Sequence, residues 1–200
     1  MSRLQGIYAI TDERLTPIDK MVSMVKEALE SGVKIVQLRD KSMADSELYE
    51  VAKELKDLIE SYDGLFIIDD RVELAKSVNA HGLHIGKDDE PIEKIRSEFK
   101  GIIGVSCYGS IERALNAQNS GADYVAFGSF FPSPTKPNSG IVKKSILKKA
   151  KERLSIPICA IGGISSDNID EITQLNPDMV AVISAVFDGN ISENIKRLGV

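Results

Sequence analysis

The chain has 200 residues, of which 42% are hydrophobic and 28% charged, and its formal net charge is −5. This is the composition of an ordinary globular protein with room for one sizeable core. The acidic balance argues against a general nucleic-acid binder, which carries a basic face, but it leaves room for a local basic pocket that holds a small anion. No apolar run approaches a membrane span and the first one begins almost at the N-terminus, leaving no space for a signal peptide, so we expect a cytoplasmic protein that does not act at membranes.

Short apolar runs recur along the chain, and each is followed by a stretch with helical periodicity. After the first run, for example, Met21, Val25 and Leu29 recur at the spacing of one helix face. The predicted strands are 6–11, 34–39, 65–70, 82–86, 102–108, 123–129, 157–164 and 179–187. Because the runs are continuous, they favour strands buried on both faces, as in a parallel sheet.

Eight strand–helix units without a linker predict a single domain over 1–200, either a closed (β/α)8 TIM barrel or an open doubly wound sheet. The last run, 179–187, is as apolar as the central ones and lacks the character of a sheet edge, which favours the barrel. A weak repeat agrees with closure, because DYVAFGS at 123–129 and DMVAVIS at 178–184 share the pattern D-x-V-A-x-x-S.

Polar residues gather where the predicted strands end, which is where a barrel of this kind places its site. Gln37, Arg39 and Lys41 alternate at the end of the second run, so they share one face. Two cations beside an amide suit a diphosphate, and the competing interpretation is a loop with ordinary surface charges.

Acidic residues follow the next two runs. Asp69 and Asp70 end the third run, and Asp88 and Asp89 follow the fourth. Acids at the end of a buried strand need an ion pair or a metal, and Mg²⁺ commonly uses one or two carboxylates together with phosphate oxygens. The alternative for Asp88 or Asp89 is a cap on the helix that begins at Pro91.

The seventh and eighth runs predict a second anion site. Gly162 and Gly163 permit a close approach of backbone to a ligand, and Ser184 lies near the end of the last run. Barrels often bind a phosphate between these two loops. The two imidazoles receive no catalytic role: we expect His84 to be a hydrogen-bonded core residue, and we assign nothing to His81.

The two cysteines and the segment 130–140 give two further predictions. Cys107 and Cys159 each lie in an apolar run without metal-ligand spacing, so we expect two buried thiols. The segment FFPSPTKPNSG at 130–140 is longer than a strand-to-helix connection needs, and a helix is predicted after it over 141–154. Its prolines restrict the backbone, which suits a segment that closes over a site.

The motifs QLRDK, FIIDDR, GLHIGKDD, IGVS, ADYVAFGSFFPSPTKP, AIGGI and VISA occur in the order and spacing of the thiamine phosphate synthase family, which the chain resembles over nearly its whole length. The resemblance implies a (β/α)8 barrel transferase. Its reaction joins the pyrimidine of 4-amino-5-hydroxymethyl-2-methylpyrimidine diphosphate to a thiazole phosphate, with or without a carboxyl group, and releases pyrophosphate with the help of Mg²⁺. The implied partners are therefore these two small molecules, with neither nucleic acid nor membrane.

The resemblance also implies roles for residues at matching positions. Asp70 and Asp89 would bind Mg²⁺, and Lys136, Arg39 and Lys41 would act on the diphosphate as the catalytic groups. The implied substrate-binding residues are Gln37, Arg39, Lys41, Asp69 and Ser106 for the pyrimidine diphosphate, Lys136 for the leaving pyrophosphate, and Ser133, Thr135, Gly163, Ile183 and Ser184 for the thiazole phosphate.

One position departs from the family pattern, because the family usually has Asn where this chain has Asp69. Asn donates to a diphosphate oxygen and ionised Asp cannot, so Asp69 is protonated, adds a metal contact, or turns away.

Two other functions fit a barrel of this kind. One is a thiazole tautomerase, disfavoured by Ser106 and Lys136, and the other is a non-catalytic barrel that binds a phosphorylated metabolite.

Overall fold

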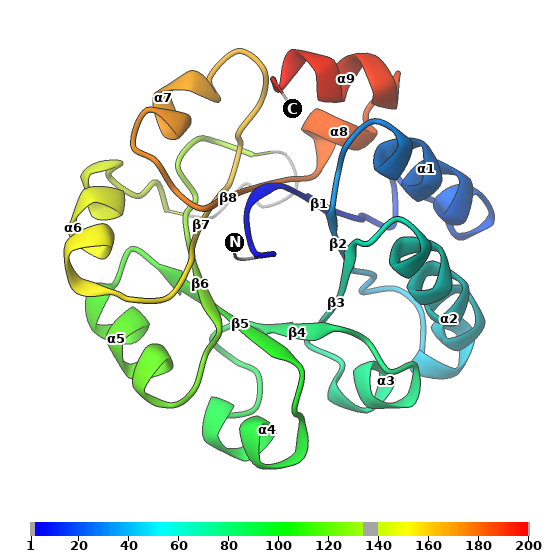
Figure 1. The fold of residues 1–200 in the computed structure, drawn as a ribbon, viewed down its shortest axis with the longest axis horizontal. Helices are drawn as coiled ribbons and strands as arrows, with labels where there is room; N and C mark the ends of the chain where they lie inside the picture. The colour runs from blue at the N-terminus through cyan, green and yellow to red at the C-terminus, as the bar shows by residue number, and fades with distance from the viewer. Residues whose placement is uncertain (1–2, 134–139, 200) are drawn as a thin grey trace.

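Parallel strands alternate with helices around a closed barrel in the computed structural model, which describes residues 3–133 and 140–199 (Figure 1). The strands are β1 Gly6–Ile10, β2 Ile35–Leu38, β3 Leu65–Asp69, β4 Gly82–Ile85, β5 Ile102–Tyr108, β6 Tyr124–Phe127, β7 Ile158–Ile161 and β8 Met179–Val182. The helices are α1 Ile18–Glu30, α2 Asp45–Ser61, α3 Val72–Ser77, α4 Ile92–Glu98, α5 Ile111–Asn119, α6 Ser145–Arg153, α7 Asp170–Thr173, α8 Ser184–Phe187 and α9 Ile191–Arg197. The predicted (β/α)8 fold is confirmed, and the assignment of the whole chain to one domain stays a prediction.

Closure depends on β1, which pairs in parallel with β2 on one side and with β8 on the other. Tyr8 is in register with Ile35 of β2 and with Ala181 of β8. An open doubly wound sheet would leave β1 or β8 as an edge, so the competing fold is excluded.

Each strand separates two layers of core. Tyr8 and Ile10 of β1 belong to the cluster inside the barrel, whereas Ile7 and Ala9 pack with the cluster that lies between strands and helices. Successive side chains of a strand point to opposite faces, so a strand with apolar layers on both sides reads as a continuous apolar run. This is why the eight runs were visible in the sequence.

Several predicted boundaries differ from the structure by one to three residues, and two are further off. The run 179–187 is a strand only to Val182, and the chain enters α8 at Ser184, because a short buried helix is as apolar as a strand. The helix predicted over 141–154 begins at Ser145, because Val142 is used elsewhere: its N–H donates to Ser129 O at 2.8 Å.

The weak repeat has a structural counterpart. Asp123, just before β6, accepts from the N–H of Ile103 through Oδ2 at 2.8 Å, and Asp178, just before β8, does the same for Ile158 at 2.8 Å. Each Asp N–H in turn donates to the carbonyl of the same partner residue. The shared Asp therefore fixes the start of one strand against its neighbour at two places around the barrel.

Both cysteines are buried free thiols, as predicted. Burial raises the pKa of Cys107 to about 12 and raises the pKa of Cys159 as well. In the described part of the chain, no helix is long and apolar enough to cross a membrane.

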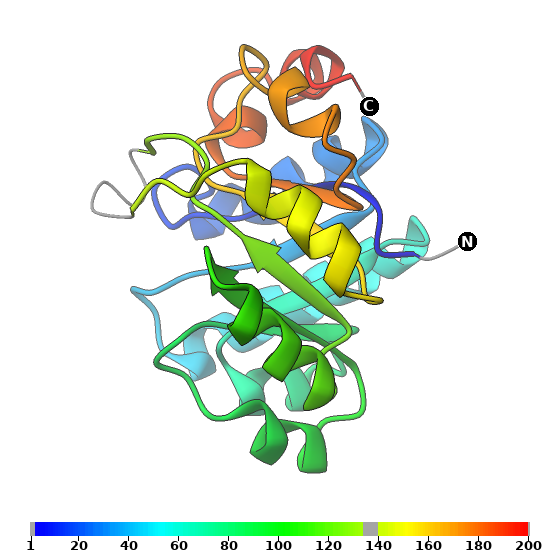
Figure 2. The same ribbon diagram turned by 90° about the vertical axis from the view of Figure 1, so that its left-hand side faces the viewer.

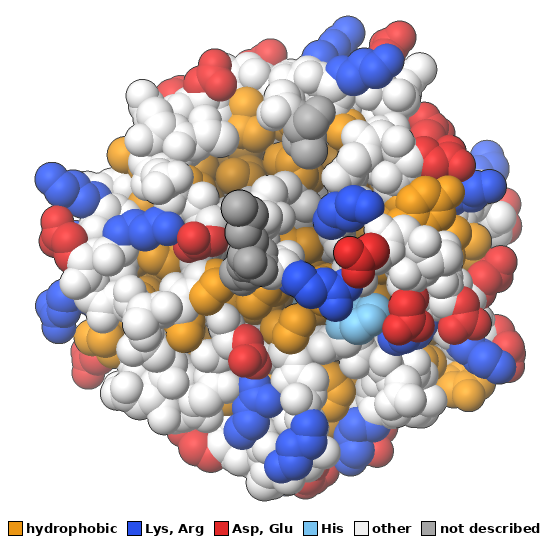
Figure 3. All heavy atoms as spheres, in the orientation of Figure 1, with side chains coloured by type: hydrophobic (Ala, Val, Ile, Leu, Met, Phe, Trp, Pro, Cys, Tyr) orange, Lys and Arg blue, Asp and Glu red, His pale blue; other side chains and the backbone are white. Residues whose placement is uncertain are grey.

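The two ends of the barrel differ. Figure 2 shows the N-terminus at one end and the described parts of the β6–α6 connection at the other. Figures 1 and 3 view the end where the N-terminus lies, and there acidic and basic side chains are intermingled rather than gathered by sign. The candidate site lies at the other end, where the strands finish.

Candidate active site

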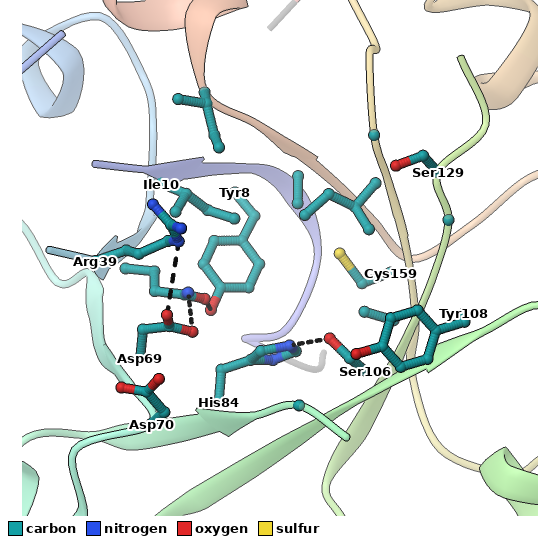
Figure 4. A pocket seen from close by; sticks show the side chains of 18 of the residues that line it. Tyr8, Ile10, Arg39, Asp69, Asp70, His84, Ser106, Tyr108, Ser129 and Cys159 are labelled. Atoms are coloured by element: carbon teal, nitrogen blue, oxygen red, sulfur yellow. Dashed lines mark hydrogen bonds and ion pairs between the residues drawn. The ribbon is translucent and has the colours of Figure 1, made fainter. Parts of the chain in front are cut away.

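A cavity of about 270 Å³ opens among the C-terminal ends of the strands (Figure 4). Its walls come from every strand or the loop that follows it, which is the usual place for the site of such a barrel. The predicted residues that line it are Gln37, Arg39, Lys41, Asp69, Asp70, Asp88, Asp89, Ser106, Gly162, Ser133 and Ile183, and residues not predicted to do so include His84, Tyr108, Tyr124, Ser129 and Cys159.

Arg39 and Lys41 converge on Asp69 from the loop after β2. Lys41 Nζ lies 3.0 Å and Arg39 Nε 3.7 Å from Asp69 Oδ2, and Lys41 also contacts Asp70. Asp69 therefore points into the pocket and does not turn away. Its carboxylate is paired with both cations.

The contacts with Asp69 and Asp70 stabilise the protonated form of Lys41. Partial burial works to lower the pKa of Lys41, but the hydrogen bond to Asp70 and the charges of Asp69 and Asp70 outweigh it, so the pKa is raised. Arg39 additionally contacts Glu13 Oε2 at 3.3 Å. Two permanent cations thus face the pocket, held in place by carboxylates that an incoming anion can displace.

Asp70 and Asp89 face the same side of the pocket from the ends of β3 and β4. Partial burial raises the pKa of Asp70, and the charges of Asp69 and Asp89 add to this effect while Lys41 opposes it. Asp89 Oδ2 accepts from the N–H of Gly86 at 2.6 Å, so it holds its own loop and does not cap α4, whose first residue follows Pro91 without a side-chain cap.

These carboxylates suit a divalent cation that also takes ligands from a substrate. Within residues 3–133 and 140–199, no group of three or more His, Cys, Asp or Glu side chains stands close enough to hold a metal by itself. The excess negative charge around Asp70 is nevertheless the environment that a cation relieves. Mg²⁺ with two carboxylates and phosphate oxygens fits this donor set.

His84 and Ser106, on β4 and β5, form the adjoining wall. His84 Nε2 lies 2.9 Å from Ser106 Oγ (Figure 4). His84 Nδ1 lies 2.9 Å from the hydroxyl of Tyr124. The prediction that His84 is hydrogen-bonded is confirmed, but its position in the core is wrong: the half-buried ring lines the pocket. Strand register would have placed it correctly. His84 is paired with Asp69 on the neighbouring strand, and residues paired in this way point to the same face of the sheet.

Tyr124 can lie beneath the pocket because β5 carries a glycine opposite it. A Cβ on Gly104 would stand 1.9 Å from the Tyr124 ring. The Gly in the IGVS motif thus makes room for a buried phenol whose hydroxyl contacts both His84 and Tyr8. The sequence contains the glycine but not its distant partner, so this contact was not predicted.

Gly162 and Gly163 permit the close approach of another protein segment. Both have positive φ, +104° and +66°, and a Cβ at either would lie 2.4 Å from an atom of Ser129 or Pro132 respectively. The described start of the β6–α6 connection therefore lies directly against the β7 loop. This packing places Ser133 at the pocket edge.

The remaining predicted residues are placed less centrally. Ile183 lines the pocket, whereas Gly163 lies just beyond the lining and Ser184 is an exposed residue at the start of α8. Thr135 and Lys136 lie outside the described residues, as does most of the predicted closing segment.

Arg113 of α5 is a structural residue that the sequence did not reveal. Its Nε donates to Ser106 O at 2.7 Å and its Nη2 to Gly86 O at 2.8 Å. Its guanidinium also lies 6.0 Å from the ring centroid of Tyr108, which lines the pocket. One side chain thus ties the end of β4 to the end of β5 behind the pocket.

Known proteins resemble this chain over nearly its full length. A family model described as thiamine monophosphate synthase matches residues 7–186. A thiamine-phosphate synthase of Wolinella succinogenes is 43% identical over 193 residues, which are 96% of this chain and 89% of the relative. A thiamine-phosphate synthase of Pyrococcus abyssi is 44% identical over 182 residues, covering 90% of this chain and 86% of the relative.

A solved structure agrees with these relatives. The thiamine phosphate pyrophosphorylase from Pyrococcus furiosus superposes with a TM-score of 0.90 at 40% identity, covering 98% of this chain and 95% of that chain. Fold, pocket position and sequence similarity therefore agree, and the chain belongs to the thiamine monophosphate synthase family.

Proposed function

We propose that the protein is a Mg²⁺-dependent thiamine phosphate synthase. It would transfer the aminopyrimidinylmethyl group from its diphosphate to the nitrogen of the thiazole phosphate and release pyrophosphate. The observation that carries the proposal is the meeting of Arg39 and Lys41 with Asp70 and Asp89 at one pocket, in a chain of this family. A barrel that binds a single phosphorylated metabolite would not need two anion sites, one for the diphosphate and one for the thiazole phosphate.

The residues of the diphosphate side stabilise the leaving group. Arg39 offers a planar fork and Lys41 a point charge, and both exchange their carboxylate contacts for phosphate oxygens when the substrate binds. Asp70 and Asp89 would hold Mg²⁺, which supplies further neutralisation of the leaving pyrophosphate when bound. Gln37 and Ser106 would position the pyrimidine ring between them.

The reaction we propose needs positioning more than acid–base chemistry. The aminopyrimidine donates electron density as its C–O bond breaks, and the resulting cation is captured by the thiazole nitrogen. Charge neutralisation on one side and a fixed nucleophile on the other account for the rate. Ser133, Thr135, Gly163, Ile183 and Ser184 are the proposed thiazole phosphate residues, and Lys136 the further cation on pyrophosphate.

The test is to mix purified protein with both phosphorylated substrates and Mg²⁺, and to measure thiamine phosphate and pyrophosphate. Equal amounts of the two products are expected. Isomerised thiazole phosphate without coupling would indicate a tautomerase instead. Tight binding of both substrates without turnover would indicate a non-catalytic barrel.

Lys136→Ala is expected to lower kcat by roughly a hundredfold, because a cation on the leaving group contributes mainly in the transition state. Steady-state kinetics gives the rate, and thermal unfolding checks that the fold survives. Lys143→Ala is the matched control, since it removes an exposed lysine from the described end of the same connection. Near-normal turnover in Lys136→Ala would remove Lys136 from the proposed mechanism.

A further inference from the structure

A continuous chain of hydrogen bonds crosses the floor of the pocket from Asp69 to Ser106. Gln37 Nε2 donates to Asp69 Oδ1 at 2.9 Å, and the Tyr8 hydroxyl donates to Gln37 Oε1 at 2.6 Å. The hydroxyls of Tyr8 and Tyr124 lie 2.9 Å apart. Tyr124 then meets His84 Nδ1, and His84 Nε2 meets Ser106 Oγ, both at 2.9 Å. The members in order are Asp69, Gln37, Tyr8, Tyr124, His84 and Ser106.

The donor and acceptor in each hydrogen bond of this chain follow from the bond that Asp69 accepts at one end. The Asp69 carboxylate, paired with Lys41 and Arg39, accepts from the Gln37 amide nitrogen. The Gln37 carbonyl therefore faces the Tyr8 hydroxyl and accepts from it. The Tyr8 proton is then committed to Gln37. Tyr8 oxygen can only accept from Tyr124.

Each phenol has a single proton to give. Burial raises the pKa of Tyr8 and of Tyr124 well above the ordinary value, so both keep their hydroxyl hydrogens. With the Tyr124 proton on Tyr8, the Tyr124 oxygen must accept from His84 Nδ1. Neutral His84 then has an unprotonated Nε2, which accepts from the Ser106 hydroxyl.

We infer that Asp69 sets the direction of this chain, so that Ser106 Oγ presents lone pairs rather than a proton to the pocket and selects ligands that donate a hydrogen bond there. An aromatic amine is such a donor. The assignment of the amine to the pyrimidine rests on the proposed function, whereas the direction of the chain does not. Asp69 thereby acts as a specificity-determining residue through four intervening side chains.

Replacement of one carboxylate oxygen should reverse the whole chain. In Asp69→Asn the amide oxygen faces the cation Lys41, which leaves the amide nitrogen toward Gln37. Gln37 then turns over, each hydroxyl donates the other way, and His84 Nδ1 accepts a hydrogen bond from the Tyr124 hydroxyl. Neutral His84 would carry its own proton on Nε2 and donate to Ser106.

The experiment is nitrogen NMR of ligand-free protein labelled with ¹⁵N-histidine at about pH 8, above the ordinary histidine pKa of about 6.5. His84 is expected as the Nδ1–H tautomer in the unchanged protein and as the Nε2–H tautomer in Asp69→Asn. His81, the other histidine of the sequence, is an internal reference: its Nδ1 accepts from the Phe66 N–H at 2.9 Å, so it is Nε2–H in both. His81→Gln assigns the signals.

A second variant tests the chain at its middle. Tyr8→Phe removes the acceptor of the Tyr124 proton, so Tyr124 donates to His84 and the tautomer switches as in Asp69→Asn. An Nε2–H or doubly protonated His84 in the unchanged protein would overturn the inference. An Nδ1–H tautomer that persists in both variants would overturn the role of Asp69.

Ligand selection is measured by calorimetry with two probes that carry the same diphosphate, the aminopyrimidine and its analogue with methoxy in place of the amine. The unchanged protein is expected to prefer the amine, and Asp69→Asn to lose about tenfold of that preference. The ratio cancels the effect of the lost charge on the diphosphate. Equal affinities in the unchanged protein would overturn acceptance by Ser106, and absence of turnover with normal tautomers would overturn only the proposed function.

Discussion

The two histidines lie near opposite ends of β4, and one stabilises the fold while the other lines the pocket. His81 precedes β4 and accepts from the backbone of β3, whereas His84 lies near the other end of β4 and faces the pocket. Burial, followed by the charge of Lys56, lowers the pKa of His81, although Glu60 opposes this. His81 is therefore held neutral, with its Nδ1 lone pair used by Phe66.

His81 is expected to make the protein less stable in mild acid. A folded-state pKa below the unfolded value means that the unfolded chain binds the proton more readily. The contribution is fully present above the unfolded pKa of about 6.5 and is lost as the pH falls through the folded value. Urea unfolding at a series of pH values measures it. His81→Asn keeps an acceptor for Phe66 N–H without titrating, and the same pH slope in this variant would contradict the role of His81.

At the level of elements, loops are positioned by contacts between units far apart in sequence. Arg113 on α5 reaches back to the ends of β4 and β5, and through Gly86 it supports the turn that holds Asp89. Asp123 and Asp178 fix strand starts in the same manner at the opposite end. Helix α5 therefore supplies a side chain that sets the geometry of two strand ends, in addition to covering the barrel.

Arg113→Ala is expected to raise the Mg²⁺ concentration for half-maximal rate and the KM for the pyrimidine diphosphate, each by about fivefold to tenfold, because Asp89 and Ser106 lose a common support. Arg113→Lys, which can reach one carbonyl, should recover part of the effect. Kinetics across a Mg²⁺ series measures both. Arg153→Ala, which removes an exposed arginine at the end of α6, is the control. An unchanged Mg²⁺ dependence in Arg113→Ala would show that Arg113 acts only on stability.

At the level of the whole molecule, the barrel is closed by strand pairing and filled by side chains on both faces of the strands. Its stability therefore does not call for a bound ion. The proposed Mg²⁺ would enter with the diphosphate, since the described residues provide two carboxylates rather than a complete ligand set.

Chelation of divalent cations is accordingly expected to abolish turnover while the unfolding temperature of the substrate-free protein stays within about 1 °C, because an ion stabilises a fold only when it binds the folded state strongly. Differential scanning calorimetry with and without chelator measures this. Restored turnover on adding Mg²⁺ is the control. A large fall in unfolding temperature would instead indicate a structural metal.

The sequence predicted the barrel well because the physical cause is local: strands covered on both faces read as apolar runs, and helices covered on one face read at helical spacing. Arg39 and Lys41 were predictable for the same reason, since alternation places them on one face. Gly104 beneath Tyr124 and Arg113 behind Ser106 were not, because each depends on a partner in another unit. The end of β8 was missed because α8 continues the apolar run.

The burial of both natural thiols makes the molecule well suited to site-specific labelling. Cys107 and Cys159 are buried, and their raised pKa values leave almost no thiolate at neutral pH, so both react with a maleimide dye far more slowly than an exposed thiol. Gly140 is exposed, and a Cβ there meets no atom of the described residues within 4 Å. Gly140→Cys therefore places one fluorophore beside the connection that leaves β6, where its emission can report substrate entry in real time without removal of any native cysteine.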